Sequence, residues 1–305
     1  MLGKNLLVTG ATGFVGLNLL PRLISAGYTV TALCRKPLSN DSPGVRWVLI
    51  GSDRSRIVEE IARSQKIDAV VHLAGRVNGR PKEIDDSNIG YTRDLLDGLQ
   101  RAGARAEILY LSSVSAIEKL GRYGLAKRAA EKLIEASPYP WKFIRSSLIY
   151  GPHERGNVGL LVESVRKWPI VPVIGGSAIE LQPLFVEDLC DVILSALAGN
   201  GRERMAYVVA GPQQIKLKDM IGIIQSNLRS YPVLLPIPLK PVQIAARFGA
   251  FLMPWANLPF QQLATLHQHA PWDSSDAKAD FGFDPRIFAK GVKMYVGSAS
   301  ECSER

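Results

Sequence analysis

A tyrosine and a lysine one helical turn apart are the residues of this sequence best placed to move a proton. Tyr123 and Lys127 lie four residues apart in the segment YGLAK, within a stretch that predicts a helix over about 123–136, so both side chains should share one face of that helix. A tyrosine hydroxyl has a pKa of about 10 in water, too high for a base at neutral pH. A lysine cation one turn away stabilises the phenolate and lowers that pKa.

A serine hydroxyl precedes this pair in the chain. The apolar run EILYLSS predicts a strand over about 107–112 that ends on two serines. We choose Ser113 as the hydroxyl that polarises a substrate carbonyl or alcohol, while Ser112 and Ser115 are neighbours that could take its place. Ser113 and Tyr123 are only ten residues apart, so the loop between them is short.

Three glycines near the start of the chain predict a phosphate-binding turn. Gly10, Gly13 and Gly16 follow the apolar run LLVT and open a predicted helix. In such a turn the first glycine permits the bend, the second lets a pyrophosphate approach and the third lets the helix pack close to the sheet. The free amides at the helix start would face the phosphates. We therefore expect dinucleotide binding; the alternative is a turn of purely structural role.

The elements that must position these residues alternate along the first half of the chain. Apolar runs predict strands at 6–9, 29–33, 45–50, 69–73, 107–112 and 141–146, and the segments between them predict helices up to 26 and over 57–65, 87–102 and 123–136. This βαβ rhythm predicts an α/β fold, a Rossmann-type doubly wound parallel sheet. Pro21 falls inside the first helix, where it would face outward or bend the helix.

The rhythm weakens after residue 150. Helices are expected at 186–198, 217–228 and 285–293, and a strand at 206–210. We therefore expect a dinucleotide-binding Rossmann core over 1–150. Residues 151–305 would be mainly a smaller substrate-binding region, with core elements interleaved near 181–210.

Composition excludes several classes of protein. The 305 residues carry a net charge of +9 and are 47% hydrophobic, which suits a folded globular chain whose positive charge attracts an anion. The basic residues form no long stripe, so no nucleic acid is expected. Three scattered cysteines predict no disulfide, and no ligand set has the spacing of a metal site. The apolar stretch 232–254 is broken by prolines, Lys240 and Arg247, so we expect no membrane span and a cytoplasmic location.

These motifs together resemble the extended short-chain dehydrogenase/reductase family, the NAD-dependent epimerase/dehydratase group. The matching segments run almost the full length: TGATGFVG at 9–16, HLAG at 72–75, Asn88 in SNIGYTRDLL, YLSSVS at 110–115, YGLAK at 123–127 and RSSLIYGP at 145–152. The resemblance implies hydride transfer assisted by Ser113, Tyr123 and Lys127. Relatives usually have a longer insert between the serine and the tyrosine, and the short loop here suggests a more open site.

The resemblance also implies which residues lie along the cofactor. A carboxylate normally ends the second strand of an NAD site, but Cys34 and Arg35 stand there. Arg35 would attract a 2′-phosphate, so we expect NADP, with NAD possible; alternatively Arg35 stacks on adenine or points to solvent. Asn88 either shapes the helix beside the site or caps it. The expected cofactor contacts are Gly10, Thr12, Gly13, Phe14, Val15, Gly16, Arg35, Asp53, Leu73, Ala74, Gly75, Asn88, Lys127 and Tyr150.

The expected substrate is a nucleotide sugar. In sugar-nucleotide members an asparagine just beyond the YGP segment contacts the substrate, and Asn157 has that place. The expected substrate contacts are Arg76, Asn78, Ser115, His153 and Asn157. Two alternatives stay open: an NADPH-dependent reductase of a non-sugar carbonyl such as a sterol, flavonoid or aldehyde, and a non-catalytic NADP-binding sensor or assembly subunit. The family's usual pairing, through the helices at 88–102 and 123–136, implies a homodimer.

Overall fold

Seven parallel strands form the central sheet of the chain. The computed structural model describes residues 3–36, 44–118, 121–154, 156–174, 180–238 and 271–302. The strand order is β11-β6-β5-β4-β1-β2-β3 and every neighbouring pair is parallel. The strands are β1 (Asn5–Thr9), β2 (Thr29–Cys34), β3 (Val45–Leu49), β4 (Ala69–His72), β5 (Glu107–Ser113), β6 (Trp141–Ser146) and β11 (Met205–Val209). This confirms the predicted Rossmann-type sheet.

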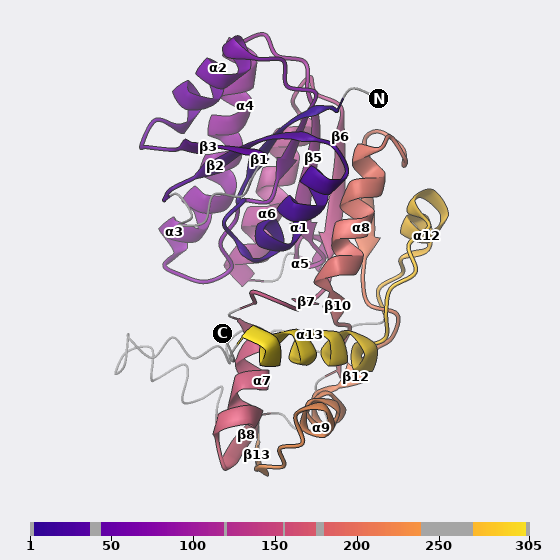
Figure 1. Cartoon of the computed structure of the whole chain (residues 1–305). Helices are drawn as coiled ribbons and strands as arrows, with labels where there is room; N and C mark the ends of the chain where they lie inside the picture. The colour runs from indigo at the N-terminus through magenta and orange to yellow at the C-terminus, as the bar shows by residue number, and fades with distance from the viewer. Residues whose placement is uncertain are drawn as a thin grey trace. The chain divides into compact units, whose positions relative to one another are not determined.

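Helices cover both faces of this sheet (Figure 1). The described helices of this part of the chain are α1 (Phe14–Ser25), α2 (Arg54–Ser64), α3 (Pro81–Asp85), α4 (Tyr91–Arg101), α5 (Ser115–Glu118), α6 (Gly121–Glu135), α8 (Val186–Leu197) and α12 (Ser275–Phe281). A π-helical turn, η1 (Asp86–Gly90), joins α3 to α4. Leu7, Val70 and Ile108 of the sheet pack with Val58 of α2 and Leu95 of α4 in one buried cluster. Arg22 of α1 pairs with Glu187 and Asp191 of α8.

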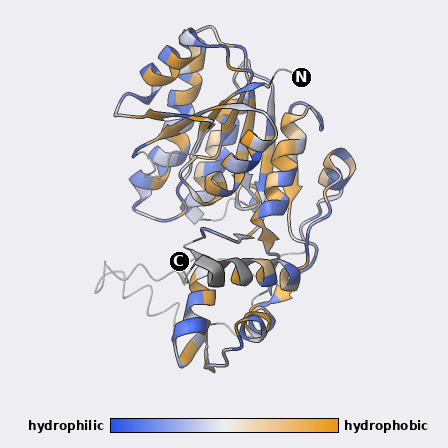
Figure 2. Ribbon diagram, in the orientation of Figure 1, coloured by the Kyte–Doolittle hydropathy of each residue, from blue (hydrophilic) through white to orange (hydrophobic). Residues whose placement is uncertain are grey.

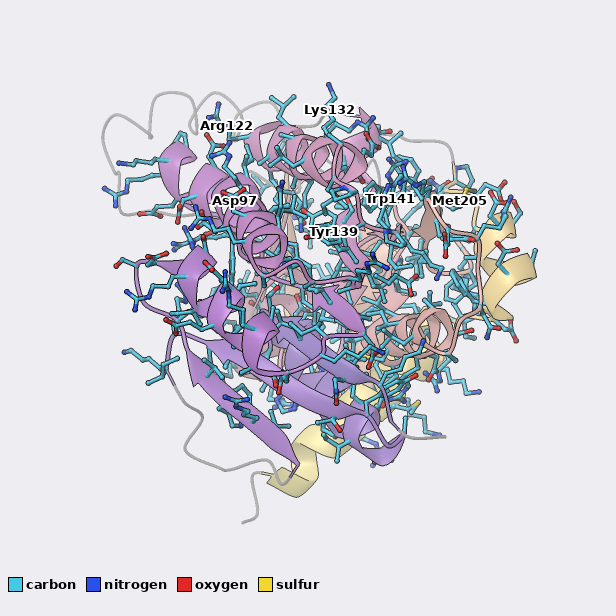
Figure 3. All side chains as sticks on the ribbon, turned by 90° about the horizontal axis from the view of Figure 1, so that it is seen from above. Asp97, Arg122, Lys132, Tyr139, Trp141 and Met205 are labelled. Carbon is cyan, nitrogen blue, oxygen red and sulfur yellow. The ribbon has the colours of Figure 1, made fainter. Side chains whose placement is uncertain are left out.

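Hydrophobic residues concentrate on the strands and on α8 (Figure 2). The strand β4 is buried along its whole length, as expected of a parallel strand that is covered on both faces. Seen from above, Trp141 at the start of β6 lies near Met205 at the start of β11 (Figure 3), which agrees with the register of Met205 opposite Lys142. The late strand β11 therefore completes the sheet that the first half of the chain begins.

The chain divides into two compact units. The first consists of residues 1–146, 187–209 and 274–283, and the second of residues 147–186, 210–273 and 284–305. The described residues of the second unit form α7 (Asn157–Lys167), α9 (Leu217–Leu228), α13 (Phe288–Cys302) and the short strands β7 (Ile149–Tyr150), β8 (Ile170–Ile174), β9 (Glu180–Leu181), β10 (Leu184–Phe185), β12 (Ile215–Lys216) and β13 (Val233–Ile237). Tyr150, Phe185 and Phe288 lie in its buried core.

Several element boundaries differ from the sequence prediction. The helix expected from residue 87 begins at Pro81 as α3, because proline fits the first turn of a helix, where its missing amide costs nothing. Helices α7 and α12 were not predicted, and the expected final helix at 285–293 begins at Phe288 and runs to Cys302. Pro21 stays inside α1 on its exposed side. Among the described residues, no helix is long and apolar enough to cross a bilayer.

Candidate active site

Tyr123 and Ser113 meet at the carboxyl end of β5. The Tyr123 hydroxyl and the Ser113 hydroxyl form a hydrogen bond. Burial raises the pKa of Tyr123 to about 12, and this hydrogen bond offsets only part of the increase. Ser113 is buried, and its oxygen also accepts a hydrogen bond from the Ser115 amide at 3.2 Å. The short loop thus brings the serine and the tyrosine together, because α5 folds back directly after the strand.

Lys127 lies on the same face of α6 as Tyr123, one turn further on. Its Nζ donates to the Leu111 carbonyl at 2.8 Å and lies 4.6 Å from the ring centre of Tyr110 and 5.9 Å from that of Tyr123. Burial lowers the pKa of Lys127 to about 7, and the nearby Glu131 carboxylate works against that decrease. We expected Lys127 to lower the pKa of Tyr123, but that pKa is raised. Burial has the largest effect on the pKa of both residues, and the Lys127 ammonium bonds to the Leu111 carbonyl.

The glycine turn has the shape that a pyrophosphate needs. Gly10 has a φ of +69°, and a Cβ placed on it would come within 2.6 Å of the Ala74 amide nitrogen. A Cβ on Gly16 would come within 2.4 Å of the Ala11 carbonyl oxygen, so this glycine lets the start of α1 pack close to the turn. Gly13 is exposed and precedes the first residue of α1. The cradle that a side chain would fill therefore fits a dinucleotide cofactor.

A buried histidine links this turn to the helix beside the site. The two ring nitrogens of His72 lie 2.6 Å from Thr9 Oγ1 and 2.9 Å from Thr92 Oγ1. Since Thr92 donates its own proton to the Asn88 carbonyl at 2.6 Å, it must accept from His72, and His72 therefore carries its proton on Nε2. Burial, and the positive charge of Lys127, lower the pKa of His72 to about 3, so the ring is neutral.

Asn88 occupies the π-helical turn and not a helix end, so the capping alternative is wrong. Its side chain is fully buried, and its Nδ2 donates to the carbonyls of Arg76 at 2.9 Å and Ile84 at 2.8 Å. Its Oδ1 has no hydrogen-bond partner among the described residues. A Cβ on Gly75 would lie 2.7 Å from this Oδ1 and 3.0 Å from Lys127 Nζ. Gly75 is therefore a point of close approach between the strand end, Asn88 and the lysine.

The remaining cofactor candidates of the first unit lie at the ends of strands and at the start of α1. Arg35 is exposed directly after β2, and its positive charge acts on the hydroxyl of Tyr91. Asp53 caps α2 by accepting the Arg56 amide at 3.1 Å. Thr12 and Phe14 are half-buried and Val15 is buried at the glycine turn, while Leu73 and Ala74 follow β4.

The predicted substrate residues divide between the two units. Arg76 and Asn78 are exposed after β4, and Arg76 pairs with Glu83 at 3.3 Å. Ser115 begins α5. In the second unit, Asn157 is the first residue of α7 and the exposed His153 has a φ of +67°. Tyr150, a predicted cofactor contact, is buried there and donates to the Phe288 carbonyl at 3.4 Å.

Two carboxylates are not among the predicted site residues: the buried Glu131 and the half-buried Glu154. Glu131 lies one turn beyond Lys127 on α6, and the spacing of Tyr123, Lys127 and Glu131 was the signal that could have found it. Glu154 accepts the amides of Val158 at 3.1 Å and Gly159 at 2.8 Å at the start of α7. Burial raises the pKa of Glu154 to about 7, against the effect of these two hydrogen bonds. Within the described part of the chain, no three metal-binding side chains cluster.

The sequence of the chain is similar to those of several known proteins. A model of the NAD dependent epimerase/dehydratase family matches residues 6–210. A putative dihydroflavonol 4-reductase of Synechocystis is 33% identical over 94% of this chain and 83% of its own length. Subunit 9 of the NADH dehydrogenase 1 alpha subcomplex of Arabidopsis thaliana is 27% identical over 86% of this chain and 67% of its own length.

A third relative is named for a nucleotide sugar. The UDP-2-acetamido-2,6-beta-L-arabino-hexul-4-ose reductase of Pseudomonas aeruginosa is 29% identical over 70% of this chain, which spans only 55% of that enzyme's length.

Solved structures share the fold at low identity. A UDP-glucose 4-epimerase of Thermotoga maritima, solved with UDP-glucose, gives a TM-score of 0.80 at 18% identity and covers 98% of this chain and 99% of its own. A dTDP-glucose 4,6-dehydratase of Streptomyces venezuelae, solved with NAD, gives 0.79 at 18% identity over 98% and 97%.

Proposed function

The chain belongs to the NAD dependent epimerase/dehydratase family, and on that premise we propose that it catalyses hydride transfer at an oxygen-bearing carbon of a small molecule. The observation that carries the proposal is the hydrogen bond between the Tyr123 and Ser113 hydroxyls, with Lys127 one helical turn away. The nicotinamide-nucleotide cofactor, when bound, supplies or accepts the hydride.

The side chains of the site each have a distinct part in this proposal. Tyr123 gives a proton to the substrate oxygen, or takes one from it, at its phenolic hydroxyl. Ser113 donates a hydrogen bond that polarises the same oxygen. Lys127 as a cation stabilises the phenolate, although burial lowers the pKa of Lys127 to about 7. The glycine turn at Gly10, Gly13 and Gly16 would hold the cofactor's pyrophosphate.

NADP is the proposed cofactor, with NAD as the alternative. Support comes from the end of β2, where the buried thiol Cys34 and the exposed cation Arg35 stand in place of a carboxylate. A carboxylate at this position repels a 2′-phosphate, whereas a guanidinium can bind one with two hydrogen bonds.

A nucleotide sugar is the first candidate substrate, with epimerisation or 4-keto reduction as the outcome. It is supported by the name of the Pseudomonas relative and by the UDP-glucose in the Thermotoga structure. One observation favours a non-sugar carbonyl instead. Glu154 already accepts hydrogen bonds from the free amides at the start of α7, beside Asn157, so these donors are not available to a diphosphate. The Synechocystis relative is named for a flavonoid reaction, in line with this second candidate.

The test is cofactor binding followed by turnover. The purified chain is titrated with NADPH and NADH by nucleotide fluorescence, and then assayed with UDP-sugars, dTDP-sugars and a panel of aldehydes, flavonoids and sterol ketones. Turnover of a sugar nucleotide supports the first candidate, and turnover confined to the other carbonyls supports the second. Tight cofactor binding with no turnover would favour a non-catalytic subunit. The Arabidopsis relative is named as a subunit of NADH dehydrogenase, in line with this alternative.

The homodimer is likewise a proposal, supported by an apolar side chain on α6. Leu125 is 49% exposed on this helix. An apolar side chain that is exposed in a single chain becomes covered when the helix packs against a second subunit. If α6 pairs with its copy, Leu125→Glu should convert a dimer into a monomer in light scattering. Wild-type protein that is already monomeric at micromolar concentration would overturn this proposal.

A further inference from the structure

The buried carboxylate of Glu131 lies on α6, one turn beyond the proposed catalytic residues Tyr123 and Lys127. The Glu131 side chain has no exposed surface, and each of its oxygens accepts two hydrogen bonds. Oε1 accepts from Ser112 Oγ at 2.6 Å and Arg145 Nε at 2.8 Å. Oε2 accepts from Arg145 Nη2 at 2.9 Å and Arg128 Nη1 at 2.8 Å. Burial alone would raise the pKa of Glu131, but these hydrogen bonds outweigh it and keep that pKa below its ordinary value.

The donors to Glu131 come from the elements that carry the site. Ser112 precedes Ser113 at the end of β5, Arg145 lies on the adjacent strand β6, and Arg128 follows Lys127 on α6. A buried ion pair is weak support for stability, because removing its charges from water costs about as much as the pairing returns. The position of this cluster therefore calls for another explanation, and Lys127 is the neighbouring group that a fixed negative charge affects.

Glu131 and Lys127 are one turn apart on the same face of α6. We propose that Glu131 is a positioning residue of the site: its carboxylate, anchored by Ser112 and Arg145, is the fixed counter-charge that favours the ammonium form of the buried Lys127. This inference rests on the proposed function, since it concerns the same site. It assigns no contact between Glu131 and a substrate or cofactor.

The other groups that face Lys127 do not supply this charge. On β5, Tyr110 has a pKa raised well above its ordinary value by burial, so its hydroxyl stays neutral. On β4, the neutral His72 has a pKa lowered to about 3. On α6 itself, Tyr123 stays protonated at neutral pH. The positive charges of Arg128 and Arg145 offset part of the attraction of Glu131, and Glu135 in turn pairs with Arg128 at 3.0 Å.

The experiment is a direct titration of Lys127 in the full chain, which needs no substrate. Protein labelled with ¹³C at the lysine Cε is titrated by NMR, and the Lys127 signal is identified by its loss in Lys127→Arg. Glu131→Gln removes the charge and keeps two polar atoms for the donors. Glu135→Gln is the matched control, because it removes a half-buried carboxylate from the next turn of the same helix, which also pairs with Arg128. Glu131→Asp restores the charge.

The expected result is a Lys127 midpoint that falls by about one pH unit in Glu131→Gln. Glu135→Gln should leave the midpoint in place, and Glu131→Asp should recover most of the fall. An unchanged midpoint in Glu131→Gln, or an equal fall in Glu135→Gln, overturns the inference. If Glu131→Gln does not fold, Ser112→Ala is used as the test variant. It removes one hydrogen bond to the Glu131 carboxylate and should lower the Lys127 midpoint by a smaller amount. An unchanged midpoint in Ser112→Ala also overturns the inference. Failure of the proposed function would appear separately, as absence of turnover with a normal Lys127 titration.

Discussion

At the scale of single residues, burial has opposite effects on the two groups that would share a proton. It raises the pKa of Tyr123 to about 12 and lowers that of Lys127 to about 7, because a nonpolar environment disfavours the charged form of each. Between these two pKa values the neutral states of both residues are therefore favoured together. Proton transfer then depends on the charges around Lys127, so small changes beside it should have large effects.

Gly75 provides one such change. In Gly75→Ala the new methyl carbon would lie 2.7 Å from Asn88 Oδ1 and 3.0 Å from Lys127 Nζ. Asn88 is held by two hydrogen bonds, so Lys127 must give way. We expect kcat to fall by about tenfold or more, with a small change in melting temperature. The control is Gly51→Ala, whose added methyl meets nothing within 4 Å; an equal loss of kcat in both variants would contradict this reasoning.

Arg35 is the residue that we propose selects NADP over NAD. Arg35→Ala should weaken NADPH binding by about tenfold or more, the value of a charge-assisted hydrogen bond to phosphate, and leave NADH binding unchanged. Arg46→Ala is the control, because Arg46 is an exposed arginine of β3 that bonds Gln65. Equal dissociation constants for NADPH in wild type and Arg35→Ala, measured by fluorescence titration, would mean that Arg35 does not bind the 2′-phosphate.

At the scale of elements, the Glu154 carboxylate accepts amides at the start of α7, and burial disfavours its charged form. The pKa of Glu154 rises from 4.5 to about 7 on folding, mainly through burial. Between these two values the folded chain keeps a proton that the unfolded chain has lost, so the free energy of unfolding should fall as pH rises through this window. Above pH 7 the anion remains buried at the helix start.

Glu154→Gln should therefore remove this part of the pH dependence. We expect the melting temperature of the variant, relative to wild type, to increase between pH 4.5 and pH 7. Glu163→Gln is the matched control, because Glu163 lies on α7 itself but is 42% exposed and paired with Arg166 and Lys167. A difference between variant and wild type that stays constant across this pH range would show that Glu154 is not protonated on folding.

Elements with a strong periodic pattern were predictable, and those set by tertiary contacts were not. The strands of the sheet agree with the predicted runs within about two residues, because β4 and β5 are buried apolar segments with clear ends. The π-helical turn at Asn88 has no sequence signal, since it depends on the buried hydrogen bonds from His72 and Thr92. Helix α7 was hidden because Glu154, three residues before its first residue, supplies the acceptor for its amides.

The candidate site was predictable in its residue types more than in its electrostatics. The motif spacing predicts that Ser113, Tyr123 and Lys127 act together, and the hydrogen bond between Ser113 and Tyr123 agrees with the grouping of these two residues. The direction of the pKa changes depends on burial and on Glu131, which a linear pattern does not report.

At the scale of the whole molecule, a parallel sheet built from strands within residues 5–146 and from β11 carries the candidate site at its strand ends. Residues 205–209 join the sheet beside β6 as β11, and residues 275–281 form α12 beside β11. Crevices outside the carboxyl ends of such strands are where α/β proteins bind ligands. Thr9, Ala74 and Ser113 all lie at or just beyond these ends, so the fold brings residues that are distant in sequence to one edge of the sheet.

The central claim is that Tyr123 transfers the proton, and its most direct test is one substitution. Hydride transfer from NADPH or NADH, with whichever substrate the panel identifies, is compared in wild type, Tyr123→Phe and Tyr110→Phe. Tyr110 is the control because it is a buried tyrosine beside the same lysine, and its hydroxyl has no partner among the described residues.

We predict that Tyr123→Phe lowers kcat by about a hundredfold or more, with cofactor binding retained, and that Tyr110→Phe keeps nearly full activity. Wild-type kcat in Tyr123→Phe would contradict the account.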